Sequence, residues 1–163
     1  MRSSYLSATW ERMIDVRKAD LEYIRILNQV IDGRLLRIAE LKSKAYPGAI
    51  AYDDSGASKP SPSNKLEDIF CEIDEEERRI NKLIDKRYAL KCQAIKEIQQ
   101  AIDPDDMVMR HILYLRYLSR KPDGASFEWS DVAGYVKIYH NIQLKRIYQL
   151  HHDAVLILSH HKM

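Results

Sequence analysis

Hydrophobic residues recur at three-, four- and seven-residue steps along residues 8–45. This spacing places apolar side chains on one side of an α-helix and is typical of a helix that packs lengthwise against another. The seam residues are Ile14, Leu21, Ile24, Ile31, Leu35 and Ile38, flanked by Leu27 and Leu41. Asn28 falls on the same seam, where a polar residue either fixes the register of a helix pair or lies at a solvated position. We therefore predict one long helix, in which Gly33 costs about 1 kcal/mol relative to alanine.

A second helix is predicted over residues 65–102, with Ser63 or Asn64 available to cap its beginning. Its apolar stripe consists of Ile69, Phe70, Ile73, Ile80, Leu83, Ile84, Leu90, Ala94 and Ile98. Two helices of nearly equal length predict a long antiparallel, coiled-coil-like hairpin over residues 1–102. Because a two-helix hairpin leaves much of a wide stripe exposed, pairing with a second copy as a homodimer is an alternative way to bury it.

The segment between the two helices, residues 46–64, contains Pro47-Gly48 and is rich in Ser, Gly, Pro and Asp. Proline followed by glycine ends a helix, and this composition is typical of a flexible loop. We expect a linker that lets the chain turn back. A loop that binds a partner or docks onto the neighbouring domain is the alternative.

Three shorter helices are predicted over residues 103–163. Asp103 is placed to cap the first, Pro104 takes its first position, and the helix ends near Ser119, before the turn sequence RKPDGAS. The second helix carries Trp129, Val132, Ala133 and Val136. A break follows at YHN, where Asn141 is available to cap the last helix. The inner face of that helix consists of Leu144, Ile147, Ala154, Val155 and Leu158.

The other side of the last helix carries the residues expected to contact DNA. Lys145, Arg146, Gln149 and His152 fall largely away from the apolar face, and Tyr148 lies near its boundary. Basic groups bind phosphates, while arginine and glutamine read base edges in the major groove. The positive charge is local, because residues 132–163 contain four Lys or Arg and a single Asp whereas the whole chain carries only +2. A surface helix with no nucleic-acid partner can have the same composition.

Cysteine usage and the N-terminus favour a soluble protein of the cytoplasm. Cys71 and Cys92 lie in one predicted helix, about 30 Å apart at about 1.5 Å per residue, so they cannot bridge each other. No stretch reaches the roughly 20 apolar residues that span a membrane, and residues 1–20 lack the apolar core of a signal peptide.

The sequence carries no motif that predicts an enzyme, a cofactor site or a metal site. A phosphate-binding loop, a dinucleotide fingerprint and a Cys-x-x-Cys pair are all missing. The pairs His151-His152 and His160-His161 lack the i, i+4 spacing that places two ligands on one helix face. The acidic cluster over residues 103–106 is explained by helix capping.

The segments LYLRYLS, WSDVA and RIYQLHHDAV, separated by polar turns, resemble sigma-70 region 4-like helix-turn-helix domains. The segment SPSNKLEDIFCEIDEEERRINKLIDKR is similar to the helical hairpin of small phage-encoded proteins that join a hairpin to such a domain. Phage transcriptional regulators of the ArpU/RinA type have this layout. The resemblance implies a recognition helix around Lys145, Arg146, Tyr148 and Gln149, with His151 as a helix-packing residue.

The chain departs from the family pattern at the turn before the recognition helix. Gly134 directly follows Ala133, and Lys137 stands where the glycine of the turn is expected. Either the second helix of the domain is extended or the turn is reshaped. We count Lys137 among the residues expected to contact DNA.

These features together predict an all-α protein with a hairpin (1–102) and a helix-turn-helix domain (103–163). The function they favour is that of a phage or prophage transcriptional regulator that binds double-stranded DNA in the bacterial cytoplasm. The hairpin would serve for dimerisation or, by analogy with region 4, for contact with RNA polymerase. The alternatives are a small terminase-like packaging or assembly adaptor, and a protein-interaction module without specific DNA binding.

Overall fold

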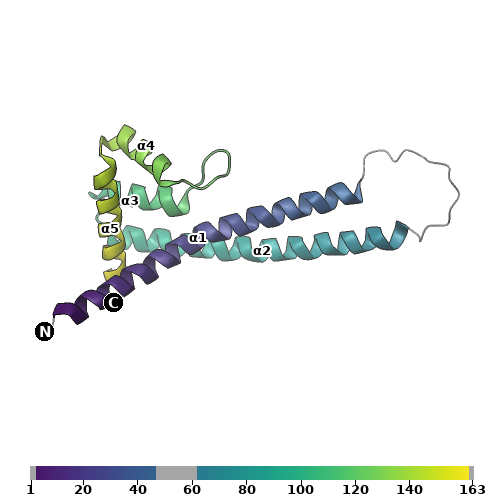
Figure 1. The fold of residues 1–163 in the computed structure, drawn as a ribbon, viewed down its shortest axis with the longest axis horizontal. Coiled ribbons are helices and arrows are strands. Elements are labelled where there is room, and N and C mark those ends of the chain that lie inside the picture. Colours follow the sequence, from purple (N-terminus) through teal and green to yellow (C-terminus); the bar gives the residue numbers. More distant parts are fainter. Residues whose placement is uncertain (1–2, 47–61, 162–163) are drawn as a thin grey trace. The chain divides into compact units, whose positions relative to one another are not determined.

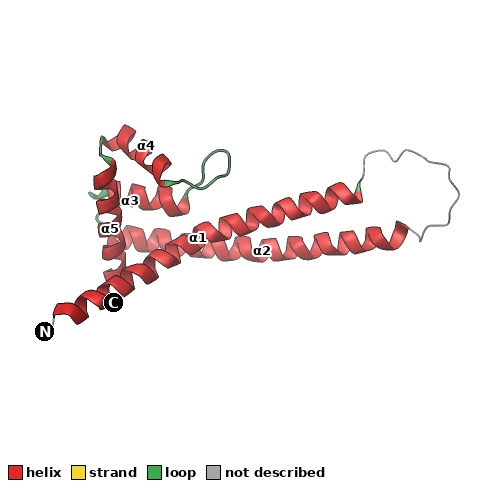
Figure 2. Cartoon of the chain, in the orientation of Figure 1, coloured by secondary structure: helices red, strands yellow, loops and turns green. Residues whose placement is uncertain are grey.

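The computed structural model describes residues 3–46 and 62–161, which form helices joined by short turns (Figures 1 and 2). The elements are α1 (Ser3–Ala45), α2 (Pro62–Ala101), α3 (Met107–Leu113), the π-helical turn η1 (Tyr114–Leu118), α4 (Trp129–His140) and α5 (Leu144–His161). Those two ranges contain no strand, and a single bridge pairs Arg120 with Ser126. The all-α prediction is thus confirmed there. The loop expected over residues 46–64 lies largely outside the described residues.

The chain divides into two units. The composite unit comprises Met1–Asn28 and Arg87–Met163, and the two-helix unit comprises Gln29–Lys86. The boundary expected between residues 102 and 103 therefore lies inside the composite unit. The reason is that one end of α1 and one end of α2 share an apolar core with the C-terminal helices.

In the two-helix unit, α1 and α2 run antiparallel. Arg34 binds Glu76 at 2.7 Å and Arg37 binds Glu72 at 2.8 Å, so numbers rise along one helix as they fall along the other. The buried residues are Ile31, Ile38, Leu41, Ala45, Ile73 and Ile80.

Two residues expected on the apolar stripes, Leu35 and Phe70, are exposed. The prediction for Leu35 is wrong because of the heptad that the buried residues of α1 follow. With Ile31, Ile38 and Leu41 on the seam, position 34 and not position 35 also falls on it. Arg34 takes that position and extends its guanidinium to Glu76. Phe70 instead makes an edge contact with the ring of Tyr46, 6.1 Å away.

The composite unit contains two adjoining apolar cores. The first joins α1 and α2 to the C-terminal helices through Leu21, Ile24, Ala94, Ile98, Ile102, Leu113, Tyr117, Leu118, Ala154, Val155 and Leu158. The second lies among α3, η1, α4 and α5 and contains Ile112, Leu115, Phe127, Val132, Val136, Ile147 and Leu150. Asn28 is buried at the edge of this unit and accepts a hydrogen bond of 2.9 Å from Arg87. The side chain of Asn28 on the seam is therefore hydrogen-bonded within the protein and is not solvated.

Two helix boundaries in the composite unit differ from the sequence expectation. α3 begins at Met107 and not at Pro104, because the Asp103 carboxylate accepts the N–H of Asp105 at 2.9 Å and holds a turn before the helix. The break expected at YHN is present, but Asn141 ends α4 instead of capping α5. Its left-handed backbone (φ 53°) and its N–H bond to the carbonyl of Lys137 close the last turn of α4.

Candidate nucleic-acid interface

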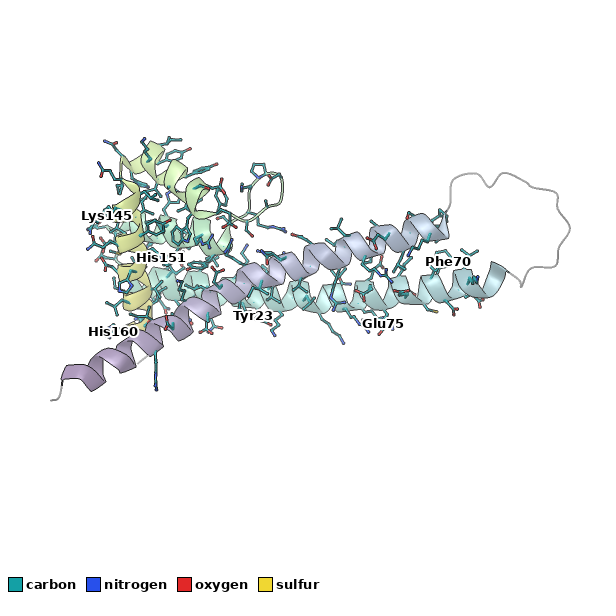
Figure 3. All side chains as sticks on the ribbon, viewed as in Figure 1. Tyr23, Phe70, Glu75, Lys145, His151 and His160 are labelled. Atoms are coloured by element: carbon teal, nitrogen blue, oxygen red, sulfur yellow. The ribbon has the colours of Figure 1, made fainter. Side chains whose placement is uncertain are left out.

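Each residue predicted to contact DNA is exposed. They are Lys137 on α4 and Lys145, Arg146, Tyr148, Gln149 and His152 on α5. The opposite side of α5 is buried and consists of Ile147, Leu150, His151, Ala154, Val155, Leu158 and Ser159. Figure 3 shows Lys145 near the beginning of this helix and His151 farther along it.

The exposed residues of α5 form one continuous strip, which we call the basic face. Lys145, Gln149 and His152 follow at i, i+4 and i+7, so they lie above one another on the same side of the helix. Arg146 lies on one flank of this strip and Tyr148 on the other. The basic face therefore places cationic side chains next to amide and aromatic ones on an exposed surface.

Lys137 lies close to the beginning of α5. It borders an open depression of about 320 Å³ that is also lined by Ala133, Gly134 and residues 141–144. In the first turn of α5 the carbonyl of Gln143 accepts the N–H groups of Arg146 and Ile147, which leaves those of Leu144 and Lys145 without an acceptor in the helix. A lysine beside free N–H groups at a helix beginning is suited to bind an anionic group such as a phosphate.

The end of α4 settles where Lys137 lies. α4 continues through Gly134 and Lys137 to His140, and its last turn closes at Asn141. As a result Lys137 stands on α4, one turn before the break, and not in the turn itself.

The basic face has no carboxylate to neutralise it. Lys137, Lys145 and Arg146 form no ion pair with another residue of the described ranges, and residues 132–161 contain only one acid, Asp153. The buried arginines of the same unit, by contrast, bind carboxylates. The three cations of the interface are therefore available to an external polyanion.

Trp129, the first residue of α4, packs against two side chains that lie one turn apart on α5. Its ring lies 5.0 Å from the ring of Tyr148 and 4.8 Å from that of His151, centroid to centroid. The guanidinium of Arg116 lies 4.9 Å from the same ring, in a cation–π contact. These contacts fix the angle at which α5 leaves α4, and they hold Tyr148 at the edge of the basic face.

A buried charge network behind the interface joins α1, η1 and the beginning of α4. Arg116 donates to the carbonyl of Phe127 at 2.9 Å, to Glu128 at 3.1 Å and to Glu22 at 3.2 Å. Arg25 donates to the other oxygen of Glu128 at 2.7 Å and to Glu22 at 3.0 Å. The hydrogen bond from Arg116, helped by the charge of Arg25, lowers the pKa of Glu128. Two arginines thus share two carboxylates.

The π-helical turn explains how Arg116 enters this network. In η1 the N–H of Ser119 bonds to the carbonyl of Tyr114, five residues back, at 2.7 Å. The widened turn buries four successive residues, from Leu115 to Leu118. A regular α-helix would expose one of these four, because its residues point about 100° apart. Sequence reasoning missed Arg116 for this reason, although an arginine inside the apolar run LYLRYL was a usable signal.

His151 and Tyr117 form a buried polar pair beneath the basic face. The Tyr117 hydroxyl lies 2.8 Å from Nε2 of His151, and burial lowers the pKa of His151 to about 4. Burial also raises the pKa of Tyr117. At neutral pH the imidazole is therefore uncharged, and its Nε2 shares one hydrogen bond with the Tyr117 hydroxyl. His151 is thus a buried residue of the packed side of α5.

A second histidine contact joins α3 to α4. His111 Nδ1 lies 3.2 Å from His140 Nε2, and both line an open cavity of about 360 Å³ together with Gln99, Met107 and Tyr114. Burial, and the neighbouring His140, lower the pKa of His111. One imidazole donates to the other, so the contact requires that at most one of the two is protonated. Sequence spacing did not indicate this pair.

The remaining candidate groups are not assembled into a site. Among residues 3–46 and 62–161, no three His, Cys, Asp or Glu side chains are placed to hold a metal ion. Cys71 and Cys92 are free thiols, and His160 and His161 are exposed at the end of α5. None of the helices described is long and apolar enough to cross a membrane.

Comparison with family models, with curated proteins and with solved structures gives no match for this chain.

Proposed function

We propose that this chain is a DNA-binding transcriptional regulator of phage or prophage origin that acts in the bacterial cytoplasm. The observation that carries the proposal is that α5 has one buried apolar side and one exposed basic side. Its apolar side is buried in the two cores of the composite unit, while Lys145, Arg146 and Gln149 are exposed and free of carboxylate partners. In this proposal α3, α4 and α5 act as a helix-turn-helix domain, with α5 as the recognition helix.

The proposed docking follows from where the charges lie. The first turn of α5 enters the major groove, as in helix-turn-helix proteins. Lys137, Lys145 and the free N–H groups of that turn bind phosphates on the groove edge. Arg146 and Gln149 lie farther into the groove and contact base edges, where arginine pairs with guanine and glutamine with adenine.

The buried network supports this function by holding the recognition helix rigidly. Trp129 packs on α5, and Arg116 binds Trp129 and Glu128 at the beginning of α4. The orientation of the helix is then set by side chains that are themselves constrained by packing. The two-helix unit, by elimination, is left for a protein contact, either with a second copy or with RNA polymerase.

DNA affinity measured across a range of salt concentrations tests the proposal. Replacing Lys145 or Arg146 with alanine should weaken binding and reduce the slope of log affinity against log salt by about one for each phosphate that the variant no longer binds. Lys96→Ala is the matched control, because it removes the same charge from an exposed position on α2. Equal affinities of all three variants and the parent protein at low salt would refute the basic face as a DNA interface.

Selection of genomic fragments separates a regulator from a packaging or assembly adaptor. The purified protein is incubated with fragments of a phage or host genome, and the bound fragments are sequenced. A regulator should enrich one promoter-proximal sequence and lose it when Gln149 is replaced with alanine. Uniform recovery of fragments, with the salt slope unchanged by Q149A, would favour an adaptor that binds DNA without sequence preference.

A further inference from the structure

His111 and His140 bring two imidazole nitrogens together where α3 meets the end of α4. Nδ1 of His111 lies 3.2 Å from Nε2 of His140, and the two rings stand nearly perpendicular, at 85°. The rings therefore meet through their nitrogen edges and not by stacking. His151 and His152 do not share this arrangement, because successive residues of a helix point about 100° apart.

The separation of the two nitrogens fits a shared metal ion. A histidine nitrogen binds Zn²⁺ at about 2.0–2.1 Å, so two such nitrogens on one tetrahedral ion lie about 3.3 Å apart. The observed distance of 3.2 Å is close to that value. The same distance also permits a hydrogen bond between the two rings. When an ion binds in place of this hydrogen bond, the donating ring carries its proton on its other nitrogen.

The two histidines open onto a cavity with room for the rest of a coordination shell. Its volume is about 360 Å³, and Gln99, Met107 and Tyr114 also line it. Both imidazoles are half-buried, so packing orders them and solvent still reaches them. One water molecule takes up about 30 Å³ in the liquid. The cavity therefore accommodates an ion together with the waters that complete its tetrahedron.

The charges around the pair are compatible with a cation. His140 is the last residue of α4, and the carbonyl end of a helix attracts positive charge. Arg110 is the one charged side chain among the residues that line the cavity. Its guanidinium donates to the carbonyls of Gln99 at 2.8 Å and Ile102 at 3.1 Å. The negative end of α2 therefore compensates this arginine in part.

We infer that His111 and His140 bind a divalent transition-metal ion such as Zn²⁺, which holds the end of α4 on α3. Imidazole suits Zn²⁺, Ni²⁺ and Cu²⁺, whereas Mg²⁺ and Ca²⁺ prefer oxygen ligands. Two protein ligands are fewer than the three of a catalytic zinc site or the four of a structural one. The ion is therefore exchangeable, with a dissociation constant on the order of 10 µM. This site does not depend on DNA binding.

Isothermal titration calorimetry of the full chain with Zn²⁺, under reducing conditions and without DNA, tests the site. The parent protein should bind one ion that His111→Gln and His140→Gln each bind about tenfold or more weakly, because each variant leaves a single imidazole. The double variant H111Q/H140Q should lose little more than either single variant, since the ion needs both ligands together. Mg²⁺ should give no binding heat with the parent protein.

Matched controls separate this site from binding elsewhere on the chain. His161→Ala removes an exposed histidine at the end of α5, and Cys71→Ser removes an exposed thiol on α2. Both variants should keep the ion that H140Q loses, and circular dichroism should show all variants equally helical. Saturating Zn²⁺ should also raise the melting temperature of the parent protein by a few degrees and leave that of H140Q unchanged.

Three results would overturn the inference. The first is a parent protein that binds no Zn²⁺ in the micromolar range. The second is binding by H111Q or H140Q as tight as that of the parent protein, which would leave the contact as a hydrogen bond alone. The third is loss of binding in H161A or C71S but not in H140Q, which would place the ion on a different group.

Discussion

The two units of this protein bury apolar residues in similar ways but differ in where most of their ion pairs lie. In the two-helix unit the pairs Arg37–Glu72 and Lys42–Glu77 lie at the surface, beside an isoleucine-rich seam. In the composite unit Arg25 and Arg116 are buried and share the carboxylates of Glu22 and Glu128. Exposed pairs contribute little to stability, whereas buried charges are costly to leave without partners.

This difference indicates a division of labour. A repeating seam with surface ion pairs specifies that two helices pair, and it tolerates exchange of its members. A network in which each buried cation needs particular carboxylates specifies one arrangement of α1, η1 and α4. We expect the composite unit to be the part whose geometry the function requires, and its residues to be the more sensitive to substitution.

A carboxylate placed in an apolar core should have the strongest effect on stability, and each unit offers one such position. Ile147→Asp buries a charge where no cation is available and should destabilise the composite unit by more than about 4 kcal/mol, with loss of the helical circular dichroism of α3 to α5. Ile80→Asp, the matched change in the two-helix unit, should loosen residues 29–86 alone. Hydrogen exchange measured by mass spectrometry distinguishes the two. Protection lost across the whole chain in Ile80→Asp would contradict the independence of the units.

Acid should destabilise the composite unit through His151. Its pKa is lowered to about 4, below the ordinary value of 6.5. Between these two pH values the unfolded chain therefore binds a proton at His151 and the folded protein does not. Stability is therefore complete above about pH 6.5 and falls by about 3 kcal/mol as the pH drops to about 4. His151→Gln should reduce this slope in urea unfolding experiments at several pH values.

A second variant identifies the cause of the acid effect. Because burial is the main reason for the low pKa, Tyr117→Phe should keep most of the pH dependence while losing the hydrogen bond. If Tyr117→Phe abolishes the slope as completely as His151→Gln does, the hydrogen bond and not burial controls the titration.

A matched pair of arginine substitutions measures the contrast between the units directly. Arg116→Met removes the hydrogen bonds to Glu22, Glu128 and the carbonyl of Phe127, and should cost about 2 kcal/mol. The cost stays below that of a fully buried pair, because the side chain of Glu128 is 61% exposed. Arg37→Met breaks an exposed pair and should leave the free energy of unfolding nearly unchanged. Equal losses in urea unfolding would remove the distinction between the units.

Much of the fold follows from local spacing, and it could be predicted for that reason. Helical periodicity located α1, α2 and the break after His140 within a few residues. The exposed side of α5 could be predicted in the same way, since residues at i, i+4 and i+7 share a side whatever lies opposite. Position 34 was missed because the apolar Leu35 fits the hydrophobic pattern better than the charged Arg34 that takes the seam.

The network behind the interface could not be predicted from spacing. Arg116 and Glu22 are 94 residues apart in the sequence, and Arg25 and Glu128 are 103 residues apart. The π-helical turn also breaks the 3.6-residue period at the point where Arg116 turns inward. Helical spacing relates only residues a few positions apart, so it cannot indicate partners that are distant in sequence. It also fails where the 3.6-residue period changes.

Substitutions of helical glycines should change stability least. Each unit has one glycine inside a helix, so the two changes in stability can be compared directly. Alanine at Gly33 or Gly134 would meet no atom within 4 Å, so each substitution should stabilise its unit by about 0.5–1 kcal/mol. Gly124→Ala should instead destabilise, since its φ of 86° disfavours a side chain.

Gly134 also borders the depression beside Lys137. If DNA approaches the α4 backbone there, Gly134→Ala should raise the melting temperature yet weaken DNA binding, whereas Gly33→Ala should raise the melting temperature alone. Equal DNA affinity in both variants would place the duplex farther from α4 than the proposed docking requires.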